Sequence, residues 1–535
     1  MVPRGDRLLA AGGLTVGAVL ALAGSAQAAP ITVTNLDSSG PGSLADALSA
    51  SNGDPTVDSI DFQSGLTGTI KLSAPLEMSR PVDVIGPWSD QITINGGGAH
   101  QIFYIYFPPY YGDPVAISGL TLTHGLADFG GGIWNRSSRL TLTDMVISHS
   151  RAVVDGGGIY SSGAVGTKLT LRSSTLSGNT AVARGGGLDI ETVLEMSDTT
   201  IAGNTVTNHG GGIALTEYGL AKIQNSTITG NGAGGDGGGI FAYSGAPAAN
   251  LEVLSSTIAG NSAAADHTGG GISLVAAPSP PPSPASPRLE NTIVSGNTAG
   301  QGSDFYSYGP PFDAAFSLIG NPSGADINPT VAGSNMTGQD PQLGPLQPNG
   351  GPTETMAPGP TSPAVDQGSA FGLLADQRGA PRPFDYPAIP ASSATGADGS
   401  DIGAVELPVP SSESGVPPSA SPSAGSSNAF SFSKVRHNRR RGTATLMVEV
   451  PGEGTLTLGG KRVVAQRPAG RAFGRTARAV AGAGVVPLVV KAKGKARRRL
   501  EGRGSARVKA TVTFTPTGGT PATATRQIRL LKKIR

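Results

Sequence analysis

A short glycine-rich phrase recurs six times between residues 130 and 272. Each copy is a glycine triplet followed by an aliphatic residue: Gly130–Ile133, Gly156–Ile159, Gly185–Leu188, Gly210–Ile213, Gly237–Ile240 and Gly269–Ile272. A second phrase, which ends in Gly-Asn, lies between the copies and terminates at Asn179, Asn204, Asn231, Asn261 and Asn297. Two interleaved phrases at a period of about 25 to 32 residues predict a repeat architecture in which each repeat packs on its neighbours.

Apolar residues inside each period alternate with polar ones. The pairs are Leu140 and Leu142, Leu169 and Leu171, Leu194 and Met196, and Leu251 and Val253. A period of two is that of a strand with one face buried. The Gly-Asn phrase and the residues after each glycine triplet supply two more short strands. Three strands per period without an intervening helix predict an all-β chain wound as a parallel β-helix.

The glycines and asparagines are predicted to form the corners of the coils. Glycine adopts the positive φ angles and the close backbone approaches that a sharp corner requires. Asparagine tolerates left-handed geometry, and stacked asparagine side chains can form a hydrogen-bonded ladder. We therefore interpret the repeated Gly-Asn pairs as structural rather than as a ligand site.

The N-terminus has the pattern of a secretory signal peptide over residues 1–28. Arg4 and Arg7 precede an apolar run, and Ala26-Gln27-Ala28 matches a small-residue cleavage site. No later segment is apolar enough over a sufficient length to span a membrane. The chain contains no cysteine, which excludes disulfide and thiolate chemistry. These features predict an extracellular or cell-surface location. A short helix over residues 42–52 is predicted to cap the first coil.

The repeated phrases resemble those of bacterial right-handed parallel β-helix surface proteins, including polymorphic outer-membrane-protein-like repeats. Residues 340–406 contain Asp340-Pro341-Gln342-Leu343, Asp376-Gln377-Arg378-Gly379 and Asp401-Ile402-Gly403-Ala404-Val405-Glu406. This block is similar to the choice-of-anchor Q domain, which ends many such proteins. The resemblance implies a right-handed, pectin lyase-like fold and a surface or secreted location, with no particular reaction.

Composition divides the chain further. Of the 39 basic and 37 acidic residues, 25 and three lie in residues 430–535, which leaves 14 and 34 in residues 1–429. The two parts therefore carry net charges of about +22 and −20, a polarity that the overall +2 conceals. We predict a β-helix with its N-terminal cap over 29–304, the end of the β-helix and the anchor-like module over 305–406, a Pro/Ser-rich linker over 407–429, and a small antiparallel β-sandwich of about five to seven strands over 430–535.

The basic domain is predicted to bind polyanions of the cell envelope. Six arginines in two runs are the candidate contacts: Arg439, Arg440, Arg441, Arg497, Arg498 and Arg499. Few aromatic residues accompany them, which argues against a dedicated nucleic-acid site. The domain resembles the Lys/Arg-rich C-terminal domains of some actinobacterial exported proteins.

Catalysis is the competing hypothesis, because β-helices also host polysaccharide lyases and glycoside hydrolases. Asp189 and Glu191 are two residues apart on one predicted strand and therefore on the same face. Asp155 and Asp236 precede glycine triplets, one and two coils away from Arg184. The chain lacks the Asn-Thr-Asp, Gly-His-Gly and Arg-Ile-Lys motifs of polygalacturonases, which weakens this hypothesis.

Metal and sugar sites have weaker support. His124, His149, His209 and His267 recur about once per coil but out of phase, so independent corner histidines are expected. Gly232–Ile240 resembles a single, incomplete copy of a calcium-binding nonapeptide. We therefore expect no cofactor, with Ca²⁺ as the alternative. Aromatic residues between Phe103 and Tyr111 are either a sugar-stacking platform or an edge cluster packed on a loop.

Two functions therefore remain open. The favoured one is an exported, noncatalytic, binding or adhesive β-helix held to the envelope by its cationic C-terminal domain, with a glycan or other surface ligand on the coils. The alternative is a polysaccharide lyase or glycoside hydrolase of the pectin-lyase-like type.

Overall fold

The computed structural model describes residues 30–106, 112–136, 138–163, 166–217, 219–244, 251–276, 286–309, 311–386, 389–407, 428, 430–438, 443–452, 454–459, 463–465, 476–480, 484–516 and 520–532. The predicted signal peptide, the candidate residues Arg439, Arg440 and Arg441, and most of the linker and of the proline-rich segment 276–287 lie outside these residues.

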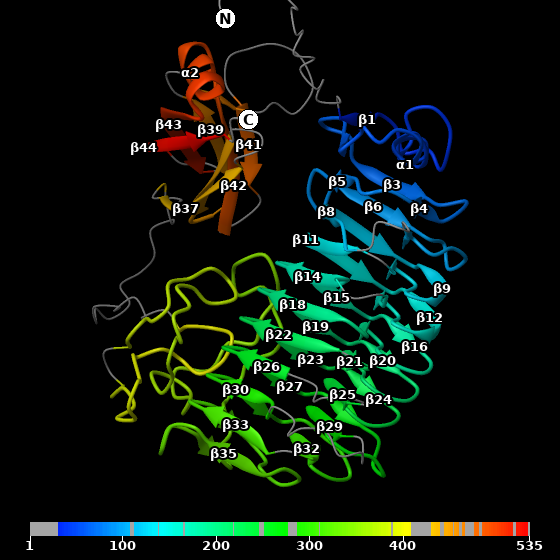
Figure 1. Cartoon of the computed structure of the whole chain (residues 1–535). Coiled ribbons are helices and arrows are strands. Elements are labelled where there is room, and N and C mark those ends of the chain that lie inside the picture. Colours follow the sequence, from blue (N-terminus) through cyan, green and yellow to red (C-terminus); the bar gives the residue numbers. More distant parts are fainter. Residues whose placement is uncertain are drawn as a thin grey trace, which may run out of the picture.

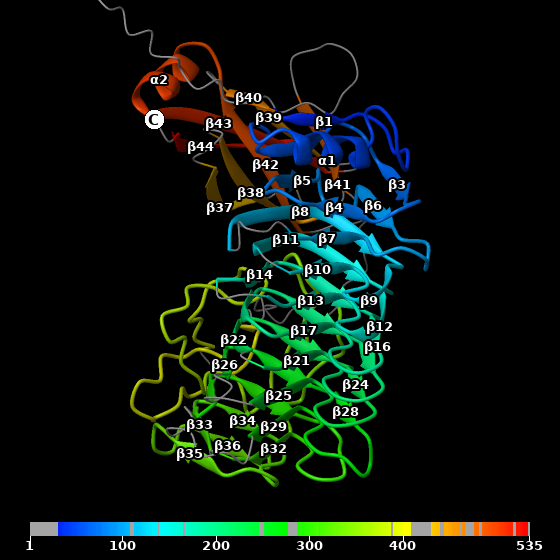
Figure 2. The same ribbon diagram turned by 45° about the vertical axis from the view of Figure 1, so that its right-hand side comes forward.

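Within the described residues the protein is all-β apart from two short helices, and its larger part is a right-handed parallel β-helix (Figures 1 and 2). One face of the β-helix is a nine-stranded parallel sheet. Its strands, in chain order, are β4 (Leu76–Met78), β7 (Phe103–Ile105), β10 (Ile133–Asn135), β13 (Ile159–Ser161), β17 (Leu188–Ile190), β21 (Ile213–Leu215), β25 (Ile240–Ser244), β29 (Ile272–Ala276) and β32 (Phe305–Tyr308).

The aliphatic residues that follow the glycine triplets stack in one interior column. Each pairs in register with its counterpart in the next coil, and none has exposed surface: Ile133, Ile159, Leu188, Ile213, Ile240 and Ile272. Phe103 and Phe305 extend the column at its two ends. The predicted parallel β-helix is confirmed by this column.

A larger sheet of 21 strands carries two of the predicted strands of each coil in succession. Its strands are β1 (Ile31–Val33), β2 (Ser59–Phe62), β3 (Gly68–Lys71), β5 (Asp83–Ile85), β6 (Ile92–Asn95), β8 (Pro114–Thr123), β11 (Arg139–Ser148), β14 (Lys168–Arg172), β15 (Thr175–Ser177), β18 (Val193–Ser197), β19 (Thr200–Ala202), β22 (Leu220–Gln224), β23 (Thr227–Thr229), β26 (Leu251–Leu254), β27 (Thr257–Ala259), β30 (Arg288–Glu290), β31 (Ile293–Ser295), β33 (Phe312–Ala315), β34 (Leu318–Ile319), β35 (Ile327–Pro329) and β36 (Met336–Thr337).

A third sheet of six very short strands was not predicted. It contains β9 (Leu126–Phe129), β12 (Arg151–Asp155), β16 (Thr180–Ala181), β20 (Thr205–Val206), β24 (Gly232–Ala233) and β28 (Ser262–Ala263). Four of these strands have only two residues, which are too few to show an alternating pattern, so their sequence resembles that of a corner. Their inward residues form a separate small cluster of Ala152, Ala181, Val206 and Ala233.

Close backbone packing explains the glycine triplets. Gly210 has a φ of +77°, a region that side chains disfavour. A Cβ added to Gly211 would lie 2.5 Å from the carbonyl oxygen of Gly238 in the next coil. Both positions therefore require glycine, for different reasons.

The asparagines form the predicted ladder along the corner between the 21-stranded sheet and the third sheet. In each step the Nδ2 of one asparagine donates to the Oδ1 of the next at 2.8–2.9 Å, through Asn179, Asn204, Asn231, Asn261, Asn297 and finally Asp304. The same acceptor oxygens also receive a backbone N–H from the preceding coil. All six side chains are buried. The ladder is part of the scaffold.

A helix closes the N-terminal end of the coils, as predicted. Helix α1 spans Leu44–Gly53, and the Ser43 Oγ accepts the backbone N–H of Asp46 as an N-cap. Leu44, Ala47 and Leu48 are buried against the first coils.

Residues 340–407 form a loop-rich segment, here called the strap, that runs along the side of the 21-stranded sheet (Figure 1, yellow). Within its described residues it contains no helix or regular strand. The Gln377 side chain accepts from the Thr227 hydroxyl at 2.7 Å and donates to the Thr200 hydroxyl at 2.9 Å. Asn225 donates to Ala375 O at 2.8 Å. The strap is thus bonded to several consecutive coils.

The C-terminal domain consists of two antiparallel four-stranded sheets and one helix. The first sheet contains β37 (Ser431–Asn438), β38 (Thr443–Val450), β42 (Gly484–Ala492) and β40 (Val463–Ala465). The second contains β41 (Thr476–Val480), β39 (Gly454–Gly459), β43 (Ser505–Pro516) and β44 (Ala522–Leu531). The antiparallel architecture is as predicted, but the strand number exceeds five to seven, and helix α2 (Lys495–Arg503) was not anticipated.

Candidate functional site

The outward face of the nine-stranded sheet gathers most of the chemically distinctive side chains of the β-helix. The residue after each inward aliphatic residue points outward, and the residue before each glycine triplet packs beside it from the corner. We call this set the outer strip; its members are Tyr104, Tyr106, Phe129, Trp134, Arg136, Asp155, Tyr160, Arg184, Asp189, Glu191, His209, Thr216, Asp236, Phe241, His267 and Thr268.

An ionic cluster occupies the middle of the outer strip. The Arg184 guanidinium contacts both oxygens of Asp155, at 3.3 and 3.1 Å, and lies 3.6 Å from Asp189 Oδ2. Glu191 accepts a hydrogen bond of 2.7 Å from the Tyr160 hydroxyl one coil away. The cluster thus joins two coils and leaves Arg184 about one third exposed.

Burial controls the protonation of the two acids on the central strand. Asp189 has no exposed side-chain surface, and its Oδ2 has no hydrogen-bond partner among the described residues. Burial raises the pKa of Asp189 to about 8, although Arg184 and the Thr216 hydroxyl oppose the rise. Burial also raises the pKa of Glu191, against the opposing hydrogen bond from Tyr160. Both pKa shifts favour the protonated form of these two acids.

Asp189→Asn is expected to stabilise the protein increasingly as pH rises. Because the folded pKa lies above the unfolded value near 4, the folded state binds the extra proton, and stability falls between about pH 4 and pH 8. The fall is at most about 1.4 kcal/mol per pH unit. Asparagine still accepts from Thr216 but carries no charge, so the variant lacks this decline. Thermal melts at pH 5, 7 and 9 should show a widening difference, whereas the exposed control Asp266→Asn should follow the wild type. Parallel melting curves would contradict the assignment.

Aromatic rings dominate the N-terminal end of the outer strip. Phe129 stacks on Tyr160 with a centroid distance of 5.0 Å, and Trp134 lies 5.3 Å from Phe129 and 5.2 Å from Tyr104. The Arg136 guanidinium lies 5.4 Å from the centroid of Trp134 and 4.7 Å from that of Tyr106. Cation–π contacts of this kind hold an exposed arginine in one orientation. We call these six residues the aromatic patch: Tyr104, Tyr106, Phe129, Trp134, Arg136 and Tyr160.

Histidines flank Asp236 on the C-terminal side of the ionic cluster. Asp236 Oδ2 lies 3.4 Å from His209 Nδ1, and its Oδ1 lies 3.3 Å from His267 Nδ1. The backbone N–H of Asp236 donates to His209 Nδ1, and burial lowers the pKa of His209. His124 and His149 stack on each other at 5.5 Å elsewhere. The expectation of independent corner histidines was therefore wrong, because neighbouring coils bring them into pairs.

The structure brings Asp155, Arg184, Asp189 and Glu191 together and places Asp236 apart from them, beside the two histidines. Tyr160 and Thr216, which bond the two acids, were missed by sequence analysis. Their signal is positional: both lie in the outward column of the nine-stranded sheet, and their partners follow only from the register between coils. Within the described residues, no group of three or more His, Asp or Glu side chains is arranged to hold a metal ion.

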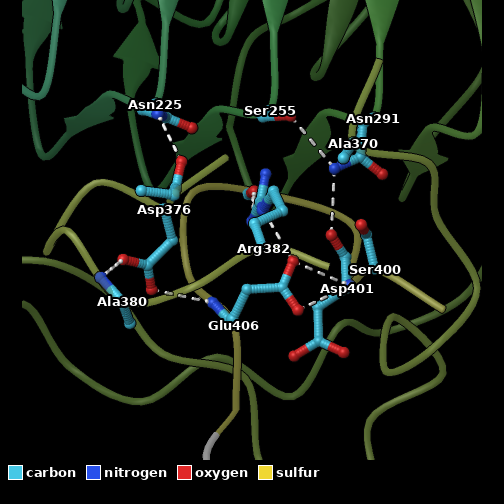
Figure 3. Close-up of polar contacts among 12 residues, drawn as sticks. Asn225, Ser255, Asn291, Ala370, Asp376, Ala380, Arg382, Ser400, Asp401 and Glu406 are labelled. Carbon is cyan, nitrogen blue, oxygen red and sulfur yellow. Dashed lines mark hydrogen bonds and ion pairs between the residues drawn. The ribbon is translucent and has the colours of Figure 1, made fainter. Parts of the chain in front are cut away.

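A second polar network lies inside the strap (Figure 3). Arg382 and Glu406 are both essentially unexposed and form an ion pair of 2.6 Å. Glu406 accepts from the backbone N–H of Asp401 and donates its own N–H to Asp376. Burial raises the pKa of Glu406 to about 8 and that of Asp401 to about 6. The network bonds strap to coils, since Asn291 donates to Asp401 O, so we interpret it as structural.

In the C-terminal domain, the candidates Arg497, Arg498 and Arg499 lie on the exposed side of α2. Arg497 pairs with Glu501 one turn away at 2.8 Å. Ala496 and Leu500 on the other side of α2 are buried in the domain core. Neither helix of the described residues has the length and apolarity that crossing a lipid bilayer demands.

The comparisons with known proteins bear on the fold. The model of the family described as a right handed beta helix region matches residues 115–308, which lie within the coils. No curated protein matches the sequence. One solved structure, a tailspike protein gp49 from Acinetobacter baumannii bacteriophage Fri1, a capsular polysaccharide depolymerase, is similar over 88% of this chain and 73% of that chain. The identity is 8% and the TM-score 0.27, values at which the likeness carries no argument about activity.

Proposed function

We propose that this chain is an exported, noncatalytic, glycan-binding protein of the cell surface. The β-helix would present the outer strip to the ligand, and the cationic C-terminal domain would hold the protein to envelope polyanions. The observation that carries the proposal is the aromatic patch, in which five aromatic side chains and an oriented arginine share an outward face beside an ionic cluster. Aromatic faces and a few fixed polar groups are typical of sites that bind small polar ligands.

Burial within the ionic cluster favours binding over catalysis. Asp189 has no exposed surface and Asp155 is almost as deeply buried, so neither carboxylate reaches a substrate. A pair of accessible carboxyl groups is what glycoside cleavage requires. The proposed binding needs no metal or cofactor.

Trp134→Ala is expected to reduce glycan affinity about tenfold or more, since truncating a central aromatic anchor usually costs more than 1.4 kcal/mol. The measurement is calorimetric titration of glycans selected on an array with the intact protein. Tyr308→Ala is the matched control, because Tyr308 is an exposed aromatic residue at the other end of the same sheet. If circular dichroism shows that both proteins are folded, equal glycan affinities of wild type and Trp134→Ala would contradict the proposal.

A polysaccharide lyase or glycoside hydrolase remains the second candidate because of Glu191. Its carboxyl group is partly exposed, has a raised pKa and is oriented by Tyr160, as a general acid would be. The same bound glycans should then yield new reducing or unsaturated ends. Product that is lost in Glu191→Gln but retained in Asp236→Asn would replace the binding proposal with this one.

The surface location also rests on sequence resemblance. Residues 340–406 resemble the choice-of-anchor Q domain, and residues 430–535 resemble Lys/Arg-rich C-terminal domains of exported proteins. The charge of the C-terminal domain supports noncovalent retention, because a net +22 attracts polyanions in a salt-dependent manner.

A further inference from the structure

Two arginines of the C-terminal domain lie directly opposite each other on neighbouring strands. Arg507 of β43 pairs with Arg529 of β44 in the antiparallel register. Both side chains are exposed and alternate with buried neighbours, so they project from the same outer face. Opposed side chains have Cβ atoms about 4.5–5.5 Å apart, and like charges in this position destabilise a sheet. Folding alone gives no reason for this pair.

Among the residues that the structure describes, the pair has no internal counter-ion. Lys509 lies two residues further along the same face, opposite Gln527. None of the ion pairs within the described part of the chain includes Arg507, Lys509 or Arg529. The four strands of this sheet contain no aspartate or glutamate. Three cations are therefore concentrated on a face without acids.

Hydroxyl groups continue the same face away from the cations. Thr511 lies opposite Thr525 and Thr513 opposite Thr523, with hydroxyl–hydroxyl distances of 3.3 and 2.8 Å. Guanidinium groups bind phosphate through two parallel hydrogen bonds, and adjacent hydroxyls can donate to further phosphate oxygens. The face thus offers charged and neutral donors in a row.

We propose that the outer face of β43 and β44, centred on Arg507, Lys509 and Arg529, binds the phosphate groups of an extracellular polymer that carries phosphate along its backbone. This inference rests on the proposed envelope retention and assigns it a site and a ligand chemistry. Helix α2 buries Ala496 and Leu500 in the core shared with the inward residues of β43, so its exposed arginines are not part of this face. They add only general attraction.

A pair of charge-matched variants of the full chain tests the assignment. Arg507→Gln with Arg529→Gln removes two charges from the proposed face, and Arg498→Gln with Arg499→Gln removes two from α2. Binding to immobilised inorganic polyphosphate is measured across a salt series. We expect the first variant to lose at least tenfold in affinity and to flatten the salt dependence by about one to two in log–log slope, because two phosphate contacts are lost. The second variant should lose less than threefold. Equal losses would overturn the site.

Further measurements distinguish the possible explanations of a loss of binding. At low salt, the Arg507→Gln, Arg529→Gln variant should melt at or above the wild-type temperature, because the repulsion is removed; a clearly lower melting temperature would overturn the like-charge argument. Polygalacturonate of matched charge should bind more weakly than polyphosphate, and equal binding would overturn the phosphate assignment. If the wild type binds and the Arg507→Gln, Arg529→Gln variant binds equally well, only this inference is overturned. If the wild type binds neither polyphosphate nor cell envelopes, the proposed envelope retention is overturned as well.

Discussion

Replacing Asn231 by alanine is expected to lower the free energy of unfolding by about 2 to 5 kcal/mol. The Asn231 Oδ1 accepts both the backbone N–H and the Nδ2–H of Asn204, and its own Nδ2 donates to Ile201 O and Asn261 Oδ1. Alanine leaves the two donors of Asn204 buried without an acceptor, and each such group costs about 1 to 3 kcal/mol. Urea denaturation of wild type and variant measures the loss.

The control is Asn208→Ala in the preceding coil, where the side chain is exposed and should change stability by less than about 0.5 kcal/mol. Hydrogen exchange gives a local readout, because the Asn204 amide bonds directly to Asn231. Its protection should fall more than that of amides in the nine-stranded sheet. Equal stability of Asn231→Ala and Asn208→Ala would show that the ladder does not support the coils.

Arg382→Ala is expected to cost about 3 to 5 kcal/mol and to release the strap from the coils. The substitution removes one partner of a buried ion pair, and the buried Glu406 carboxyl then keeps its desolvation cost without the compensating contact, which is among the most destabilising changes in a protein. Limited proteolysis within residues 340–407, followed by mass spectrometry, detects the release. Cleavage should begin at lower temperature in the variant.

Two further variants identify the cause. Arg288→Ala removes an exposed partner of Glu290 and should have little effect, because surface ion pairs contribute about 0 to 1 kcal/mol. Adding Glu406→Gln to an Arg382→Met background replaces the unpaired carboxyl group by an amide and keeps an acceptor for the Asp401 amide, so much of the stability should return. A double variant no more stable than Arg382→Ala would assign the loss to packing instead.

The coils were predictable because their cause is local and repeated. Glycine triplets and Gly-Asn pairs recur at every corner, so one interpretation is tested six times along the chain. The strap was not predictable in this way. Gln377 bonds Thr200 and Thr227, which are 177 and 150 residues away in the sequence, and no periodic pattern predicts such contacts. Helix α2 was missed because only Ala496 and Leu500, four residues apart, carry its apolar face.

The outer strip was predicted in part. Strand alternation was enough to place Asp189 and Glu191 on one face, and the corner position was enough to bring Asp155 near Arg184. Tyr160 and Trp134 required the register between coils, which decides which outward residues become neighbours. The burial of the acids could not be predicted from the sequence either. Asp189 was expected to face solvent, but the packed corner covers its side chain completely.

The direction of the asparagine hydrogen bonds has a consequence for the insertion or deletion of whole coils in such a protein. Every asparagine donates toward the C-terminus, and Asp304, which can only accept when ionised, ends the series. A duplicated coil would therefore be accepted anywhere along the series without new chemistry. The strap is bonded to the coils from Asp198 onward, so a coil inserted beyond that residue satisfies the asparagine series but must also be bridged by the strap.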